Sequence, residues 1–290
     1  MLTANEHYKM VFGRKMYKAS ISFSKTCPNR DGSKGTGGCI FCSAGGSGEF
    51  ASECNKSITG QINDAILLVE KKAGPGAGYI AYFQSFTNTY CDPDELAAAL
   101  DEAASHPKIL ALSIATRPDC LPGPVMEVIS DYAKKIPLYV ELGLQTSNDE
   151  TAKLINRCYE TSIYDDAVVR LKEAGVNVIT HVIFGLPGEK EEQMMETVRH
   201  AVEAGTDGIK FTCLYVLKDT VLEKMWNAGE FEVLGQEEYF VIVEKAISLL
   251  PPDIVVHRLT GDGPKKLLLA PLWTADKRGV INYINRRFKL

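Results

Sequence analysis

Three cysteines in one glycine-rich loop, Cys27, Cys39 and Cys42, have the residue type and the spacing to do chemistry. Three thiolates can hold three irons of a cubane [4Fe–4S] cluster, which leaves the fourth iron open to an outside ligand. Seven glycines in residues 32–48 let the backbone wrap closely and offer amide donors to sulfur. The loop therefore predicts a metal site with an open position, which points to chemistry rather than to a structural staple.

A zinc site is the main alternative for these thiols. Zinc in a structural site takes four ligands, and Cys54 or His7 could supply the fourth. Three ligands and a water molecule would instead make a catalytic zinc centre. In a reducing compartment the remaining cysteines are expected to be buried or incidental thiols. They are Cys91, Cys120, Cys158 and Cys213, together with Cys54 if it binds no metal.

The chain after the loop alternates between strand-like and helix-like runs. Strands are predicted over residues 16–23, 79–84, 108–116, 138–144, 176–184 and 208–215. Helices are predicted over residues 57–72, 93–105, 123–135, 149–156, 164–173, 190–203 and 236–250, followed by a strand at 254–258 and a terminal helix. Strands joined by helical crossovers form parallel sheets with both faces covered. The pattern predicts an α/β fold, a partial (β/α)6 barrel with reactive groups at the C-terminal ends of its strands.

Polar side chains at alternate positions are predicted to face the interior of this barrel. Glu141, Gly143 and Gln145 fall on one face of their strand, with leucines on the other face. Tyr82 and His181 hold similar positions on two other strands. A barrel with a purely structural role would carry Val or Leu there, because unpaired polar groups are costly to bury. The alternation therefore favours ligand binding inside the barrel.

Length, hydropathy and charge bound the other possibilities. A chain of 290 residues with 45% hydrophobic residues can bury a large core. We divide it into an N-terminal extension (1–15), a core barrel (16–218) and a C-terminal cap (219–290) packed on the core. The N-terminus lacks an apolar core segment and the apolar runs are too short to span a bilayer, so we expect a cytoplasmic protein without membrane contact.

The charge is unevenly distributed. The net charge is −5, yet residues 258–290 hold eight Lys or Arg against two Asp, a local charge of +6. A basic tail on an acidic body can mark a nucleic-acid contact, but taken alone it more often marks a solvated helix face.

Seven segments carry a family resemblance. They are CPNRDGSKGTGGCIFC, AYFQSFTNTY, IATRPDCLP, VELGLQT followed by INR, HVIFGLPGE, DGIK, and HRLTGD through LLLAPLW. They occur in this order over nearly the whole chain. With them the chain resembles the radical S-adenosylmethionine superfamily, and within it a bacterial branch similar to the radical domain of the Elongator catalytic subunit. The resemblance favours the iron–sulfur cluster over zinc.

The resemblance implies two cofactors. A [4Fe–4S] cluster would be held by Cys27, Cys39 and Cys42, and S-adenosylmethionine would bind at its open iron. The side chains expected to contact S-adenosylmethionine are Phe41, Gln84, Ser85, Thr87, Glu141, Gln145, Arg157 and His181. Residues 84–87 stand where relatives hold the methionine amino group, and Phe41 could lie over the adenine ring.

The chain departs from the family pattern at three places, and the first is residues 84–87, where the glycines of the usual amino-binding turn are absent. It carries Cys158-Tyr159 where relatives carry Gly-His, and Thr212 where they carry a histidine. If those histidines serve the substrate, the substrate of this protein or its proton handling differs. Cys91 and Cys158 then become candidate thiols on the substrate side.

The implied activity begins when a partner such as flavodoxin or ferredoxin reduces the cluster. Cleavage of S-adenosylmethionine gives methionine and a 5′-deoxyadenosyl radical that abstracts hydrogen from the substrate. The Elongator-like resemblance and the basic tail favour a tRNA base, contacted through Lys265, Lys266, Arg286 and Arg287. A small metabolite or a peptide is an alternative substrate, and Arg258 is expected either to reach it or to form a buried salt bridge. A non-catalytic iron–sulfur or zinc module that binds a partner is the alternative from another class.

Overall fold

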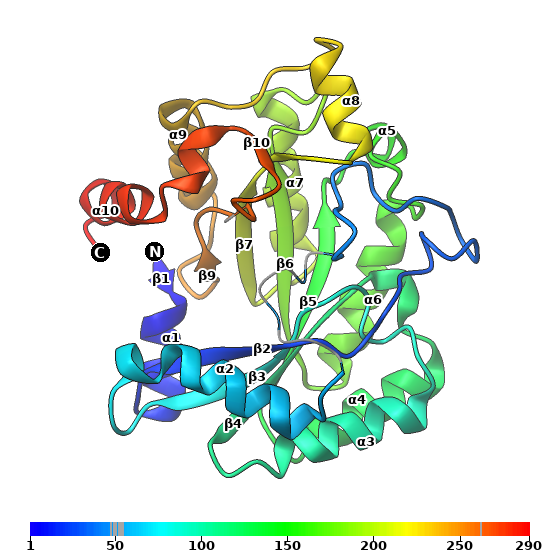
Figure 1. Ribbon diagram of the computed structural model, residues 1–290, viewed down its shortest axis with the longest axis vertical. Coiled ribbons are helices and arrows are strands. Elements are labelled where there is room, and N and C mark those ends of the chain that lie inside the picture. Colours follow the sequence, from blue (N-terminus) through cyan, green and yellow to red (C-terminus); the bar gives the residue numbers. More distant parts are fainter. Residues whose placement is uncertain (47, 49–50, 52–54, 262) are drawn as a thin grey trace.

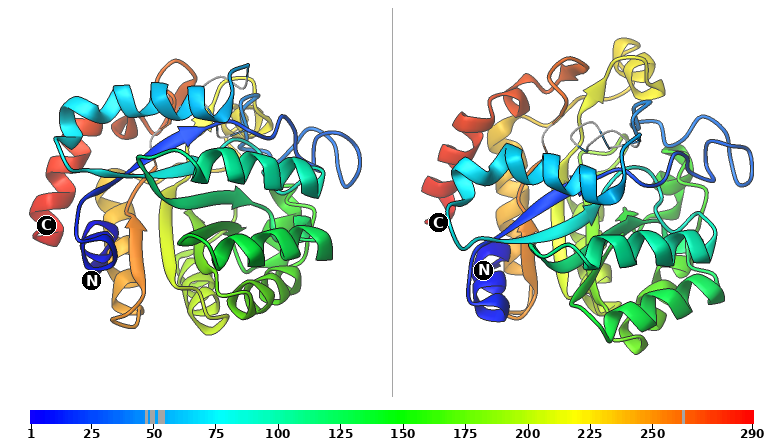
Figure 2. Two further views of the ribbon diagram at one scale, coloured as in Figure 1. Left: turned by 90° about the horizontal axis from the view of Figure 1, so that it is seen from below. Right: turned by 60° about the horizontal axis from the view of Figure 1, so that its bottom comes forward.

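The computed structural model describes residues 1–46, 48, 51, 55–261 and 263–290. Its central feature is one sheet of eight parallel strands in the spatial order β1-β9-β7-β6-β5-β4-β3-β2. The strands are β1 (Leu2–Thr3), β2 (Met16–Ile21), β3 (Gly78–Phe83), β4 (Ile109–Thr116), β5 (Leu138–Gln145), β6 (Asn177–Phe184), β7 (Gly208–Cys213) and β9 (Val255–Arg258). Figures 1 and 2 show that the sheet curves into a half-barrel. The predicted α/β partial barrel is confirmed, and its six expected strands are β2 to β7.

Helices cover the convex face of the sheet (Figure 2). The helices that follow the strands are α2 (Ile58–Ala73), α3 (Pro93–Ala104), α4 (Gly123–Ala133), α5 (Asp149–Leu154), α6 (Thr161–Glu173) and α7 (Glu191–Glu203). Local chemistry sets their ends: α3 begins at Pro93 because the Asp92 side chain accepts a hydrogen bond from the backbone of Asp94. No helix among the described residues has the length and apolar character needed to cross a membrane.

The chain after β7 adds a second group of elements at the mouth of the half-barrel. Its helices are α8 (Val221–Asn227), α9 (Gln236–Ser248) and α10 (Lys277–Phe288). In this group β8 (Val216–Leu217) and β10 (Leu268–Ala270) form a small antiparallel pair, and a 3-10 turn lies at Leu272–Ala275. Another 3-10 turn, Pro118–Cys120, follows β4 in the main sheet.

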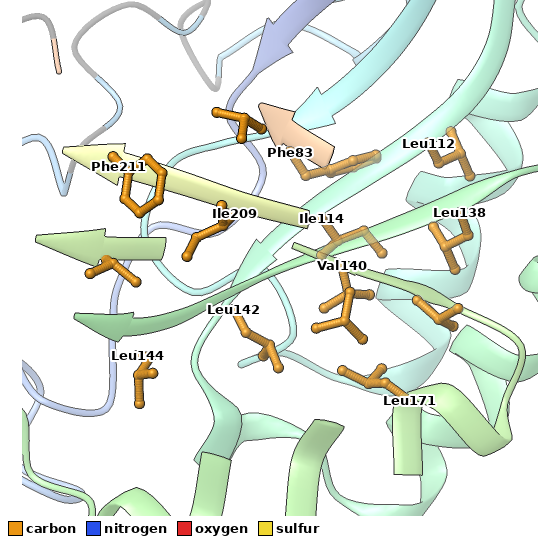
Figure 3. Close-up of a cluster of buried hydrophobic side chains, with 14 of the residues drawn as sticks. Phe83, Leu112, Ile114, Leu138, Val140, Leu142, Leu144, Leu171, Ile209 and Phe211 are labelled. Atoms are coloured by element: carbon orange, nitrogen blue, oxygen red, sulfur yellow. The ribbon is translucent and has the colours of Figure 1, made fainter. Parts of the chain in front are cut away.

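The hydrophobic core lies between the convex face of the sheet and these helices. Figure 3 shows Val140, Leu142 and Leu144 of β5 within this layer, near Leu171 of α6. All four side chains are completely or almost completely buried. The alternation predicted for β5 is therefore confirmed on its apolar side, because the leucines pack outwards and leave Glu141, Gly143 and Gln145 for the concave side.

Both ends of the chain contribute to one edge of the sheet. β9, which belongs to the segment expected as a cap, pairs with β7, and β1 of the N-terminal segment pairs with β9. Helix α1 (Ala4–Phe12) follows β1 and begins with a capping box between Thr3 and Glu6. The two segments expected to flank the barrel thus supply its outermost strands on that edge.

Candidate functional site

A cavity of about 810 Å³ lies on the concave side of the half-barrel. Strands β2 to β9 line its walls, and the cysteine loop lines its rim. Of the predicted site residues, those that line it are Cys27, Cys39, Cys42, Phe41, Gln84, Thr87, Glu141, Gln145, Arg157 and His181. The remaining one, Ser85, is buried behind the wall, where its hydroxyl pairs with that of Ser22 at 2.7 Å. The structure therefore gathers into one space nearly all residues that the sequence singled out.

Backbone and side-chain hydrogen bonds shape the cysteine loop. The amide of Cys42 donates to the carbonyl oxygen of Cys39 at 2.9 Å, which forms a tight turn between these two thiols. Arg30 donates to the carbonyl oxygens of Cys42 and Ser43 and lies over the ring of Phe86. These contacts direct the loop inwards, so that its three cysteines face the same cavity.

Cys39 is a half-buried thiol that lines the cavity. Burial raises the pKa of Cys39 to about 12, and the nearby Cys42 and Cys27 act in the same direction, while Arg117 opposes them. The Asn29 side-chain amide donates to Cys39 Sγ at 3.7 Å. A metal that binds here must displace the thiol proton, and the amide then stabilises the thiolate.

The structure does not support the zinc site through His7. His7 contacts Tyr139 and Tyr8 in the aromatic cluster formed with α1, and it does not line the cavity. Cys54, the other predicted fourth ligand, lies outside the described residues. Within the described part of the chain, no three His, Cys, Asp or Glu side chains form a group that could hold a metal ion. The cysteines therefore share a cavity without forming a closed metal site.

Arg157 differs from its predicted role as a cofactor contact. It is completely buried, and its guanidinium donates to the carbonyl oxygens of Leu144, Thr146 and Tyr159 at 2.6–3.1 Å. It also donates to Thr161 and Asp149. Because protein acceptors occupy all its N–H groups, Arg157 holds the end of β5 in place rather than presenting donors to a cofactor.

Tyr159 takes up the space between two guanidinium groups. The guanidinium carbons of Arg157 and Arg117 lie 4.3 Å and 4.9 Å from its ring centroid. Its hydroxyl donates to the carbonyl oxygen of Gly143 and to Gln145 Oε1 at 3.2 Å. Tyr159, noted in the sequence only as a departure from the family pattern, thus orients the predicted cofactor residue Gln145.

Arg117 is a cavity residue that sequence reasoning missed. It forms a bidentate pair with Asp119, with both N–O distances 2.9 Å, and Lys34 approaches the same carboxylate at 3.2 Å. Burial raises the pKa of Asp119, but Arg117 and Lys34 lower it by more, so the carboxylate is ionised at neutral pH. The sequence did contain a signal for Arg117, because this residue lies in one of the matching segments, directly after a strand.

A buried ionic network spans the interior of the half-barrel. Glu141 has no exposed side-chain surface, and its carboxylate pairs with Lys18 of β2 and Lys210 of β7. It also accepts hydrogen bonds from Ser113 and from His181 Nε2, each at 2.8 Å. His181, expected to touch the ribose or adenine, therefore has one ring nitrogen committed to Glu141. Lys18 and Lys210 were missed by the sequence reasoning, although each lies on the inward alternation of its strand.

The network shifts the pKa values of its members. Burial raises the pKa of Glu141, but the charges of Lys18 and Lys210 lower it by more, to well below the usual range. Burial and the charge of Lys210 lower the pKa of His181 to about 4, so its imidazole is neutral at pH 7. Burial also lowers the pKa of Lys210 well below its usual range, although Glu141 opposes this. The interior thus keeps a carboxylate ionised while it disfavours further positive charge.

Aromatic rings close the N-terminal end of the barrel. Tyr8 of α1, Tyr139 of β5 and His257 of β9 lie edge to face, with ring centroids 5.8–6.4 Å apart. Helix α1 therefore forms a floor beneath the network, and the cysteine loop lies at the opposite end of the strands. Neither of the two candidate thiols on the substrate side, Cys91 and Cys158, lines the cavity. Arg258, the other residue expected to reach the substrate, does line it.

The chain matches two protein-family models, the Radical SAM superfamily over residues 21–201 and the Radical_SAM C-terminal domain over residues 206–289. It is 39% identical to the uncharacterized protein YtqA of Bacillus subtilis, over 99% of this chain and 89% of YtqA. It is 28% identical to a tRNA uridine(34) acetyltransferase of Dehalococcoides mccartyi, over 67% of this chain and 42% of that protein. Its fold is similar to the solved structure of an Elp3 from Methanocaldococcus infernus, with a TM-score of 0.67 and 20% identity, over 94% of this chain and 63% of that one.

Proposed function

This chain belongs to the radical S-adenosylmethionine superfamily, and on that premise we propose that it abstracts hydrogen from a substrate held inside the half-barrel. It is an enzyme of this class, with a [4Fe–4S] cluster and S-adenosylmethionine as cofactors. When bound and reduced, these cofactors supply the electron and the 5′-deoxyadenosyl radical. The protein itself binds the substrate, orients it and excludes water.

Cys27, Cys39 and Cys42 are the proposed cluster ligands. Their donor type fits, since iron–sulfur clusters are bound by thiolates, and all three line the cavity. The Asn29 side-chain amide donates to one of these sulfurs, Cys39 Sγ. Gln145 is a proposed contact of S-adenosylmethionine, held by Tyr159. Phe41, Gln84 and Thr87 are further proposed contacts, because they line the same cavity.

One observation carries this proposal: the cysteine loop opens onto the same enclosed space as the polar residues of the strand interiors. A module that only held a metal for its own stability would not need Glu141 or His181 inside the barrel, where burying polar groups is costly. A reactive species produced at the rim would reach a substrate bound against these residues. The electron donor is proposed to be a small redox protein such as flavodoxin or ferredoxin.

The test uses protein reconstituted anaerobically with iron and sulfide, then given dithionite and S-adenosylmethionine. We expect formation of 5′-deoxyadenosine, quantified by chromatography, and its loss in a variant with Cys27, Cys39 and Cys42 changed to alanine. The matched control is Cys91→Ala, because Cys91 does not line the cavity. An intact cluster that binds S-adenosylmethionine but never cleaves it, with or without candidate substrates, would favour the non-catalytic module instead.

A tRNA base is the second, finer proposal for the substrate. The observation that favours it is the similarity to a tRNA uridine(34) acetyltransferase. The basic tail supports it less than expected: Lys265, Lys266 and Arg286 are exposed, but Arg287 pairs with glutamates of α9. A Lys265→Glu, Lys266→Glu variant should bind tRNA more weakly and with a smaller salt dependence. Equal tRNA affinity of variant and wild type would exclude these two lysines as RNA contacts.

A further inference from the structure

Among the described residues, the interior of the half-barrel holds more cationic side chains than carboxylates. Lys18 and Lys210 approach Glu141 from β2 and β7, strands that lie five places apart in the sheet. Both ammonium groups also lie over the ring of Tyr82, 4.2 Å and 4.9 Å from its centroid. Two cations from opposite walls thus converge on one carboxylate in the middle of the cavity.

Arg258 adds a third cation to this group. It lies on β9 directly beside Lys210 in the strand register, and it lines the cavity. Its Nε donates to the carbonyl oxygen of Thr260, and no ion pair joins Arg258 to a carboxylate of the described residues. Three cations therefore face one carboxylate, and Glu141 is the one acidic residue among the described residues that line the cavity.

Two other cavity arginines are compensated near the rim. Arg117 is paired with Asp119, and Arg157 is saturated by backbone acceptors and Asp149. The cations near Glu141 are different, because among the described residues that line the cavity Glu141 is their one carboxylate. Burying several cations close together is costly, and burial together with the charge of Lys18 lowers the pKa of Lys210, although Glu141 opposes this. An anion placed among these three cations would remove it.

The cations around Glu141 lie away from the cysteine loop, where the cofactors are proposed to bind. Lys18 lies three residues before the end of β2, which is about 10 Å along a strand at ~3.3 Å per residue. Cys27 lies further along the chain, beyond that end. A ligand that binds the cluster at the rim would therefore leave the space around Lys18 and Lys210 available.

We propose that Lys18, Lys210 and Arg258 form a binding site for an oxyanion of the substrate, a carboxylate or a phosphate group of a small molecule. The inference rests on the proposed radical function, because it names the class of substrate for that same cavity. The oxyanion would approach from the cysteine-loop end, since Tyr8, Tyr139 and His257 close the other end. Its contact with the three cations would hold the remainder of the molecule between them and the rim.

The test is isothermal titration of the reconstituted protein, saturated with S-adenosylmethionine, with sodium phosphate and separately with sodium acetate. We expect at least one anion to bind, and the Arg258→Gln variant to bind it at least tenfold more weakly. Arg258→Gln leaves no buried carboxylate without a partner, so folding should be retained. The control is Arg286→Gln, an exposed arginine of α10, which should leave the affinity unchanged. Binding of phosphate would indicate a substrate with a phosphate group, and binding of acetate would indicate a substrate with a carboxylate.

Three results would overturn the site. They are binding of neither anion, equal affinity in Arg258→Gln and Arg286→Gln, or anion binding that is seen only when S-adenosylmethionine is left out. Lys18→Gln provides a second variant on the opposite wall, with the same expected loss of affinity. Formation of 5′-deoxyadenosine is measured on the same samples. If it forms without anion binding, the oxyanion site alone is wrong; if anions bind without its formation, the radical function alone is wrong.

Discussion

The substitution Glu141→Gln tests whether the cations inside the barrel are charged and held by one carboxylate. The Glu141 side chain has no exposed surface, and it accepts from two lysines, a serine and a histidine. Glutamine keeps the shape but removes the charge, and its amide group would face an ammonium group. The two lysines would then be buried without a counter-charge.

Removing one partner of a buried ion pair typically costs about 3–5 kcal/mol. In this protein Lys210 can lose its proton, which limits the loss of stability. Burial already lowers the pKa of Lys210, and removing the charge of Glu141 would lower it further. We therefore expect a loss near the lower end, about 3 kcal/mol at pH 7. For a chain of this size, that corresponds to a fall in melting temperature on the order of 5–10 °C.

Urea unfolding followed by circular dichroism measures the loss in the free energy of unfolding, with Glu203→Gln as the control. Glu203 is an exposed glutamate at the end of α7, and its substitution should change the free energy of unfolding by less than about 0.5 kcal/mol. A lysine pKa that is lowered in the folded state means that this state binds fewer protons than the unfolded state below pH ~10.4. The difference in the free energy of unfolding between wild type and Glu141→Gln should therefore shrink as pH rises towards 10. A loss below about 1 kcal/mol at pH 7, or one independent of pH, would refute the charged network.

Three further predictions concern the floor, the network and the cysteine loop. Tyr8→Ala should lower the free energy of unfolding by about 3 kcal/mol, measured in urea, because it empties a buried ring position beneath the barrel. His181, with its pKa lowered to about 4, contributes stability that is present above pH ~6.5 and lost as pH falls towards 4; His181→Asn should flatten this part of the stability profile. Asn29→Ala removes the N–H donor to Cys39 and should lower the midpoint potential of the bound cluster, measured by redox titration; an unchanged potential would contradict that contact.

Much of the barrel could be predicted from the sequence, because its strands alternate between core leucines and inward polar residues. Strand β5 shows this most clearly, with Leu142 and Leu144 packed against helices and Glu141 in the cavity. Lys18 and Lys210 were missed because a lysine in a strand is usually exposed, and only the curvature of the sheet brings β2 opposite β7. The capping box of Thr3 and Glu6 was a readable helix signal that went unused.

The limits of motif reasoning are clearest at Arg157. Its spacing from Gln145 matched a family pattern, yet spacing along a chain does not reveal which acceptors surround a guanidinium. The backbone decides this, because residue 145 has a φ of 62° and the carbonyl groups on either side of it, those of Leu144 and Thr146, accept from Arg157. A role assigned from a motif therefore needs a count of the donors that remain available, and that count is a property of the fold.

The departure at residues 158–159 shows how this chain couples that turn to the cysteine loop. Cys158 has a φ of 62°, a conformation that glycine adopts freely and that costs other residues about 1 kcal/mol or more. The thiol of Cys158 donates to Asn29 Oδ1 at 3.0 Å, and the amide of Asn29 donates to Cys39 Sγ at 3.7 Å. The strained residue therefore orients the side chain that contacts a proposed cluster ligand. Its neighbour Tyr159 orients Gln145 in the same cavity. Residues 158 and 159 thus connect the turn after β5 to both proposed cofactor sites.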